Sequence, residues 1–175
     1  MAIGKTQGVN WIYFPSSKRP PQLAEDVIAI FNAAASAISS ASNNLSSNDV
    51  LRVIAPGLAA KNFLVETGKK AKEKVTVPVL FGRNGQLRKH FCADAFHQGE
   101  GFVVEIEAGR AVTNHQFLKD LFEACMMADV RTLCIAVRNI YSRQKDFEYI
   151  ATFFDTLYAS NRLTLPLEGI LLIGY

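Results

Sequence analysis

The chain has 175 residues, with 19 lysines and arginines against 16 aspartates and glutamates, a formal charge of +3, and 49% hydrophobic residues. This length supports one domain with a proper core, and the composition is that of a globular protein rather than a disordered or fibrous one. The charge permits an anionic partner. It is far from the strongly basic balance that by itself indicates a nucleic-acid-binding protein.

Cysteine usage and the lack of long apolar runs predict a cytoplasmic protein. The three cysteines are scattered without a CxxC pair, so we expect reduced, mostly buried thiols and no disulfide framework. No run approaches the ~18 apolar residues of a membrane span, and the opening MAIGKTQGVNWIYF lacks the continuous apolar stretch of a signal peptide. We therefore expect no association with a membrane.

The first 48 residues are expected to add an arm and a helix to the main domain. Residues 1–22, which contain WIYF and PSSKRPPQ, are typical of an arm or a lead-in loop. Apolar residues then follow a helical repeat over 23–38, which predicts a helix. The Ser/Asn-rich segment 39–48 should connect it to the rest of the chain.

A second helix is expected over residues 49–68. Its cap should be one of three polar residues, Ser47, Asn48 or Asp49. The Pro56-Gly57 pair should break or kink this helix, because proline lacks a backbone N–H and clashes with the preceding turn.

Three strands joined by two short turns are predicted next, at 75–81, 87–96 and 102–110. The turns are the glycine-containing segments GRNGQ and HQGEG. Pro78 predicts that the first strand lies at the edge of a sheet, since it cannot donate a ladder hydrogen bond. The three strands should form a continuous antiparallel meander.

The remaining chain alternates helices and strands: a helix at 113–129, a strand at 132–141, a helix at 145–159 and a strand at 167–175. The first of these helices should begin at Thr113 or Asn114. Its inward residues should be Phe117, Leu118, Leu121, Phe122 and Cys125. The second should pack through Phe147, Ile150, Phe154 and Leu157. A meander followed by strand–helix–strand units predicts one α/β domain over residues 1–175, with a mixed central sheet flanked by helices.

Three carboxylates are the main candidate functional residues. Glu105 and Glu107 alternate on one strand and should emerge on the same face. The turn HQGEG places Asp94 of the preceding strand close to direct opposition to Glu105. The local sequence offers no cation to match them, which favours a bound divalent metal, Mg²⁺ or Mn²⁺, because all the ligands are oxygens. The alternative is a solvated outer face of the sheet.

The pattern Asp94, ten residues, Glu105-Ile106-Glu107, within the order α-β-β-β-α-β plus an extra α-β, resembles the PD-(D/E)xK nuclease superfamily over residues 49–175. The resemblance implies a restriction endonuclease-like core, with Asp94 and Glu105 as metal ligands and the Ile106 carbonyl as a backbone ligand. Glu107 stands where the motif usually has lysine, and Ala93 replaces its proline. The Glu-x-Glu variant is similar to that of BamHI/BglII-type restriction endonucleases.

Further residues are candidates for supporting roles. By the same resemblance Glu66 corresponds to an additional acid on the preceding helix, and Glu107 would ligate a second ion or orient the attacking water. Gln116 could hydrogen-bond a metal-bound water, although capping or a surface role is an alternative. Candidate phosphate contacts are Arg88, Lys89, Arg110 and Arg143, the first two beside the scissile phosphate. The alternative for Arg110 is an ion pair with one of the acids, and the other three could be ordinary solvated side chains.

The resemblance implies a Mg²⁺-dependent endonuclease of the restriction type that hydrolyses double-stranded DNA. An enzyme with one site per chain that cuts both strands of DNA is expected to act as a homodimer. The aromatic arm or the helix at 23–38 would form the dimer contact or cover the core. The rival interpretation is a nuclease fold without catalysis, acting as a nucleic-acid-binding or regulatory module. A third is a metal-free interaction domain with Glu105 and Glu107 in open solvent.

Overall fold

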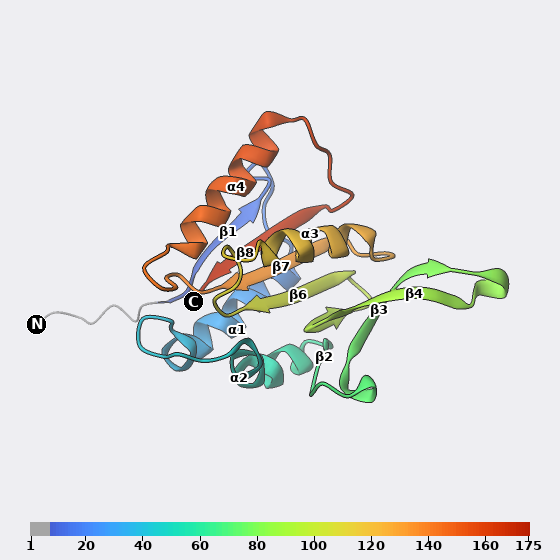
Figure 1. Ribbon diagram of the computed structural model, residues 1–175, viewed down its shortest axis with the longest axis horizontal. Coiled ribbons are helices and arrows are strands. Elements are labelled where there is room, and N and C mark those ends of the chain that lie inside the picture. Colours follow the sequence, from blue (N-terminus) through green and yellow to red (C-terminus); the bar gives the residue numbers. More distant parts are fainter. Residues whose placement is uncertain (1–7) are drawn as a thin grey trace, which may run out of the picture.

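The computed structural model describes residues 8–175, and the beginning of the expected arm, residues 1–7, lies outside them. A six-stranded sheet with the order β1-β8-β7-β6-β5-β2 forms the centre of the protein (Figure 1). Its strands are β1 (Asn10–Phe14), β2 (Leu64–Val65), β5 (Ala95–His97), β6 (Phe102–Glu107), β7 (Thr132–Val137) and β8 (Gly169–Gly174).

The sheet is mixed, as the order of elements predicts. Strands β6, β7 and β8 are parallel neighbours. The other three join antiparallel: β1 pairs with β8, β5 with β6, and β2 with β5. Parallel neighbours need a crossover connection, and α3 (Gln116–Met126) and α4 (Asp146–Ser160) supply the two crossovers.

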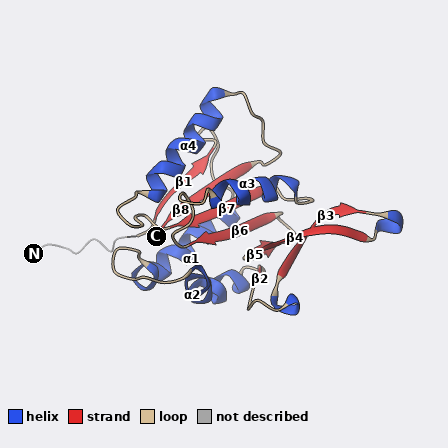
Figure 2. Cartoon of the chain, in the orientation of Figure 1, coloured by secondary structure: helices blue, strands red, loops and turns tan. Residues whose placement is uncertain are grey.

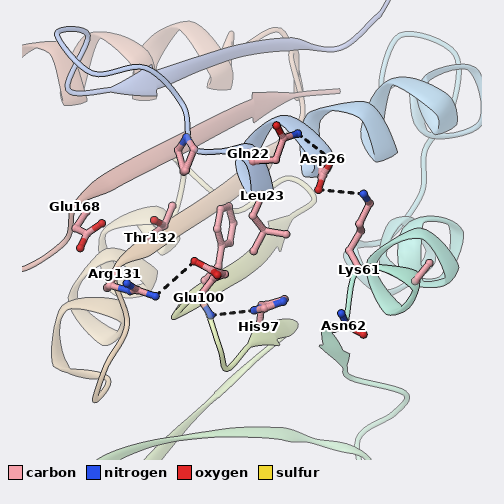
Figure 3. A pocket seen from close by; sticks show the side chains of 13 residues that line it. Gln22, Leu23, Asp26, Lys61, Asn62, His97, Glu100, Arg131, Thr132 and Glu168 are labelled. Atoms are coloured by element: carbon pink, nitrogen blue, oxygen red, sulfur yellow. Dashed lines mark hydrogen bonds and ion pairs between the residues drawn. The ribbon is translucent and has the colours of Figure 1, made fainter.

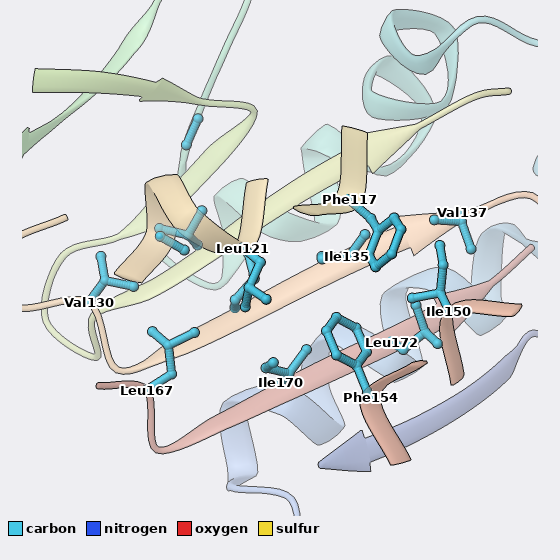
Figure 4. Close-up of a cluster of buried hydrophobic side chains, with 14 of the residues drawn as sticks. Phe117, Leu121, Val130, Ile135, Val137, Ile150, Phe154, Leu167, Ile170 and Leu172 are labelled. Carbon is cyan, nitrogen blue, oxygen red and sulfur yellow. The ribbon is translucent and has the colours of Figure 1, made fainter. Parts of the chain in front are cut away.

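Helices cover both faces of the sheet, which confirms the expected α/β class. Helices α1 (Gln22–Ile38) and α2 (Ser47–Ala60) lie on one face, and α3 and α4 lie on the other (Figures 1 and 2). Each face buries its own apolar cluster. The cluster under α3 and α4 includes Phe117, Leu121, Ile150 and Phe154 (Figure 4). The cluster under α1 and α2 includes Val27, Phe31, Ile54 and Leu58.

The expected meander is wrong in one respect, because its first hairpin leaves the central sheet. Strands β3 (Val75–Phe81) and β4 (Leu87–Ala93) pair only with each other, and the short 3-10 turn η2 (Arg83–Gly85) joins them. The predicted strand 87–96 is therefore two strands, β4 and β5, which separate at Asp94. The β3–β4 ribbon projects away from the body of the protein (Figure 2).

The segment WIYF is not a free arm. It lies in β1, whose register with β8 runs from Asn10 opposite Gly174 to Phe14 opposite Ile170. Phe14 is fully buried on the α4 side of the sheet, while Tyr13 is buried on the α1 side. Residues 10–14 thus complete the sheet and cover its two cores, which is one of the two roles expected of the aromatic arm.

Helix α2 differs from its prediction at both ends and in the middle. It begins after Ser46, which forms a capping box with Asp49, rather than at one of the three predicted caps. It runs through Pro56 without a break and ends at Ala60, so residues 61–68 are not helical. Packing of Val50, Leu51, Ile54 and Leu58 into the core outweighs the hydrogen bond lost at Pro56.

Helix α3 corrects two further expectations. It begins after His115, a residue in the left-handed conformation that makes no side-chain cap, and not after Thr113 or Asn114. Its buried positions include Asp120, whereas Phe122, expected inside, is 56% exposed. The face predicted for α4 is confirmed at Phe147, Ile150 and Phe154.

The cysteines and the helices bear on two expectations from composition. All three cysteines are free thiols, but Cys92 is exposed and only Cys134 is fully buried, so "mostly buried" was wrong. Within residues 8–175, no helix has both the length and the apolar character that a membrane crossing requires.

Candidate active site

The two glutamates of β6 emerge on the face of the sheet that α3 covers. Phe102, Val104 and Ile106 point into the cluster under α1 and α2, while Val103 points into the cluster under α3 and α4. Because side chains alternate along a strand, Glu105 and Glu107 follow Val103 to the α3 side. Both are half-buried, so the predicted shared face is confirmed and an open, fully solvated face is not what surrounds them.

Asp94 lies beside them because β4 ends and β5 begins on either side of this residue. The β5–β6 ladder ends with Ala95 opposite Val104, so continuing the register places Asp94 opposite Glu105. The chain instead turns into β4, which leaves the Ile106 N–H without a strand partner. The Asp94 side chain accepts from that N–H at 2.8 Å, and the carboxylate takes the place of a ladder carbonyl.

A fourth acid, Asp120, joins this group from α3, and the sequence reasoning missed it. Its side chain is 5% exposed, although aspartate is seldom buried without a partner. One oxygen accepts from Gln116 Nε2 at 3.3 Å. The signal in the sequence is its position: Asp120 is three residues after Phe117 and four before Ala124, on the apolar face of an amphipathic helix.

The four acids hinder each other's ionisation. Burial raises the pKa of Glu105 well above its ordinary value, and the neighbouring carboxylates of Asp94, Asp120 and Glu107 raise it further. Burial likewise raises the pKa of Glu107 to about 8, helped by the charge and hydrogen bond of Asp120. At neutral pH this group therefore holds protons that ordinary carboxyls would have lost.

Asp120 and Asp94 are shifted less because each has a partner that favours its charged form. Burial raises the pKa of Asp120 to about 7, while Lys119 and the Gln116 amide oppose the shift. Burial raises the pKa of Asp94 to about 6, and the Ile106 N–H counteracts it most strongly. A carboxylate that accepts a backbone hydrogen bond is stabilised in its ionised form.

The site includes cations that the sequence reasoning did not assign to it. Lys74 forms an ion pair with Glu66 at 2.7 Å and favours the ionised form of Asp94. Glu66 itself is not on a helix, contrary to expectation, but follows β2 in a loop. Its backbone N–H donates to the Asp94 carbonyl at 2.8 Å. Glu66 therefore lies next to Asp94, but on a loop rather than on the helix that the resemblance implied.

The donor chemistry of the group fits a hard divalent cation, since every candidate ligand is a carboxylate oxygen. Asp120 Oδ2 is buried and has no hydrogen-bond partner within residues 8–175. In the arrangement described, no three Asp, Glu, His or Cys side chains within those residues are placed to hold one ion.

Other predicted site residues lie apart from the acids. Arg88 and Lys89 are exposed on β4, five or six residues before Asp94, which is about 16–20 Å along an extended strand. They therefore do not lie beside the acid group, although the sequence suggested that they would. Arg110 and Arg143 are exposed in loops. Gln116 contacts Asp120, and the Ile106 carbonyl as a ligand stays a prediction.

A separate cavity of about 410 Å³ lies at the opposite end of β6 and β7, near Phe102 and Thr132 (Figure 3). Two ion pairs lie in it: Lys61 with Asp26 at 3.1 Å and Arg131 with Glu100 at 3.6 Å. His97 Nδ1 accepts the Glu100 N–H at 3.0 Å. Among the Asp, Glu, Lys and Arg side chains of the cavity, only Glu168 has no ion pair within residues 8–175, so the cavity lacks the concentration of uncompensated charge of the acid group.

Comparisons with known proteins do not assign the chain to a family. No family model matches it, and no curated protein matches its sequence.

Proposed function

We propose that the protein is a metal-dependent endonuclease of the restriction type, with a restriction endonuclease-like core, which hydrolyses phosphodiester bonds of double-stranded DNA in the cytoplasm. The observation that supports this most is the group of Asp94, Glu105, Glu107 and Asp120. Four acids gather at one face of β6, where burial raises the pKa of each. Such an arrangement is costly for a protein unless something else uses the charge.

In this proposal Asp94 and Glu105 hold Mg²⁺ or Mn²⁺. The bound ion would polarise a phosphate oxygen and lower the pKa of a coordinated water. Asp94 is held in position by the Ile106 N–H. Glu107, once ionised, orients the attacking water and accepts its proton, which is the role left open by the missing motif lysine. Asp120 sets the protonation of Glu107 from the other side.

The direct test is cleavage of supercoiled plasmid DNA in Mg²⁺ or Mn²⁺ by the wild-type protein, Asp94→Asn and Glu105→Ala. Loss of one such electrostatic contribution should lower the rate by about 10²–10³-fold. A matched control is Asp155→Asn, which removes an exposed acid from α4, outside the site. It should cleave at the wild-type rate.

Two outcomes would contradict the proposal. Equal nicking by all four proteins would identify a contaminating nuclease. No cleavage by the folded wild-type protein with either ion would reject catalysis on DNA.

The products also report on the assembly. A homodimer that cuts both strands yields linear plasmid directly, whereas a monomer accumulates nicked circles first. Sedimentation of the free protein and of its DNA complex should show two chains per duplex under the homodimer hypothesis.

A second candidate is a nuclease-fold protein without catalysis that binds nucleic acid or another partner. Two observations favour it: Glu107 replaces the motif lysine, and no three candidate ligands among residues 8–175 are already placed around one ion position. It predicts DNA binding that needs no divalent ion and is unaffected by Glu105→Ala. Calorimetric titration with Mg²⁺ separates the two candidates, because only the nuclease should bind it through Asp94.

A further inference from the structure

The β3–β4 ribbon is the part of the protein that the acid group does not explain. We call residues 78–90, its outer half and connecting turn, the arm. Every residue from Leu80 to His90 is exposed, and Figure 1 shows the ribbon extending well beyond the rest of the fold. Isolated two-stranded hairpins are marginally stable in water. A hairpin that projects from the fold in this way is therefore expected to have a function, such as contact with a partner.

The base of the ribbon is firmly attached to the body. Val75, Val77 and Ala93 are buried in the cluster under α3 and α4. The Ala128 N–H, at the end of α3, donates to the Pro78 carbonyl at 2.7 Å. The arm is therefore held as a directed extension of the core rather than as a free loop.

The cations of the arm equal the net formal charge of the whole chain, which is +3. Residues 75–93 contain Arg83, Arg88 and Lys89 and no aspartate or glutamate. Because the chain has 19 basic and 16 acidic residues, the rest of the protein is balanced between the two signs. The excess of positive charge on this projecting ribbon is complementary to a polyanion.

The tip of the arm is also apolar. Leu80, Phe81 and Leu87 are each at least half exposed, an unusual concentration of large apolar side chains on one short hairpin. Addition of a further strand by a second copy is disfavoured, because the register shifts between Pro78 and Phe81 and Pro78 itself interrupts the ladder. These features favour a partner with both negative charge and apolar surface.

We infer that the arm enters the major groove of duplex DNA and holds it against the acid group. That groove, about 12 Å wide and 8.5 Å deep, admits a two-stranded β-ribbon. The cations of the arm contact phosphates, and its apolar tip contacts base edges such as thymine methyl groups. The choice of DNA as the polyanion rests on the proposed function. Asp94 directly follows the last residue of β4, so the arm and the acids share one strand junction.

The test compares two triple variants of equal charge. Arg83→Ala/Arg88→Ala/Lys89→Ala removes the arm cations, and Arg19→Ala/Arg52→Ala/Arg162→Ala removes three exposed arginines elsewhere. Both are made in a Glu105→Gln background so that no DNA is cut. Binding of a short fluorescein-labelled duplex is followed by anisotropy over about 50–200 mM salt. Loss of three phosphate contacts should reduce the slope of log K against log salt by about 3.

The expected result is weaker binding, at least about tenfold at low salt, and a smaller slope for the arm variant alone. Methyl green, a major-groove ligand, should compete with the wild-type protein, whereas netropsin, a minor-groove ligand, should not. Equal affinities and slopes for the two triple variants would overturn the inference. So would competition by netropsin alone, or a tip variant (Leu80→Ser/Phe81→Ser/Leu87→Ser) that changes the sedimentation of the free protein but not DNA binding.

The result is separable from that of the cleavage assay. A protein that cleaves plasmid with no dependence of binding on the arm would retain the proposed function and lose this inference. A protein that binds DNA through the arm but never cleaves it would do the reverse. Thermal unfolding of each variant confirms that the substitutions leave the core intact, which is expected because all six replaced cations are exposed.

Discussion

Glu107 and Asp120 meet across the space between β6 and α3, and burial makes both of them harder to ionise than free carboxyls. Asp120 adds to the shift at Glu107 through its charge and its hydrogen bond. Two carboxylates can share a hydrogen bond only if one is protonated, and the pKa values of about 8 and about 7 keep a proton in the pair at neutral pH. The proton is thus a structural component of the site. A divalent cation bound there would have to displace it.

Replacing Asp120 by asparagine should release Glu107 toward ordinary behaviour. The substitution removes a charge and a hydrogen bond that both raise the pKa of Glu107, so that pKa should fall clearly below about 8. Carboxyl ¹³C NMR titration measures it directly. Asp155→Asn, an exposed change on α4, should leave the Glu107 titration unaltered. An unchanged Glu107 pKa in Asp120→Asn would show that burial alone sets it.

The same raised pKa values predict how stability varies with pH in the absence of divalent ions. A carboxyl whose pKa is higher when folded binds more protons in the folded state, so its stabilising contribution is complete below the unfolded pKa and is lost as pH rises. For Glu107 that window runs from 4.5 to about 8. Denaturant unfolding should therefore show the free energy of unfolding declining across it.

Glu107→Gln isolates this contribution, because it removes the titration while keeping the shape of the side chain. The difference in unfolding free energy between the variant and the wild type should favour the variant increasingly from pH 5 to pH 8. Each 1 kcal/mol corresponds to about 2–4 °C in Tm for a chain of this size. Parallel pH profiles for the two proteins would mean that Glu107 titrates normally.

At the scale of elements, the contribution of each α3 residue to stability depends on whether it lies on the face that meets the sheet. Leu121 is 1% exposed within the cluster of Figure 4, whereas its neighbour Phe122 is 56% exposed. Leu121→Ala should lower the free energy of unfolding by about 2–5 kcal/mol, while Phe122→Ala should change it by less than about 0.5 kcal/mol. Equilibrium urea unfolding provides both values. Similar losses of unfolding free energy in the two variants would show that the buried face of α3 is assigned incorrectly.

The elements that the sequence predicts well are those with a strong period of their own. Helices α1 and α4 and the buried strands β7 and β8 follow directly from their apolar patterns. Strand β1 was missed because its five residues precede a proline-rich stretch, and only pairing with β8 makes them extended. A break or kink was expected in helix α2 at Pro56 because local propensity does not include the packing that carries the helix through this residue.

The candidate site was partly accessible from the sequence for a similar reason. Hairpin spacing is a local property, so it brought Asp94 opposite Glu105 correctly. The positions of Asp120 and Lys74 depend on how α3 and the β3 ribbon pack, which is not local. Glu66 was placed next to Asp94 by resemblance, yet on a loop rather than on the predicted helix.

At the scale of the whole molecule, one sheet carries two cores that cannot be separated. Strand β1 covers the outer edge of β8 and contributes Phe14 to one core and Tyr13 to the other. Helix α1 closes the second core through Val27 and Phe31, both fully buried. The N-terminal segment is therefore part of the folding unit, although the nuclease resemblance begins only at residue 49.

Residues 49–175 alone should consequently fail to fold, because β8 would expose its edge and the face of the sheet under α1 would lose its cover. The fragment should give poorly dispersed amide NMR signals and no cooperative thermal transition, in contrast to the single transition expected of the full chain. Adding residues 1–48 as a separate peptide should restore dispersion, since β1 and α1 would dock on their original contacts. A fragment 49–175 that unfolds cooperatively without the peptide would show that the core under α3 and α4 is sufficient.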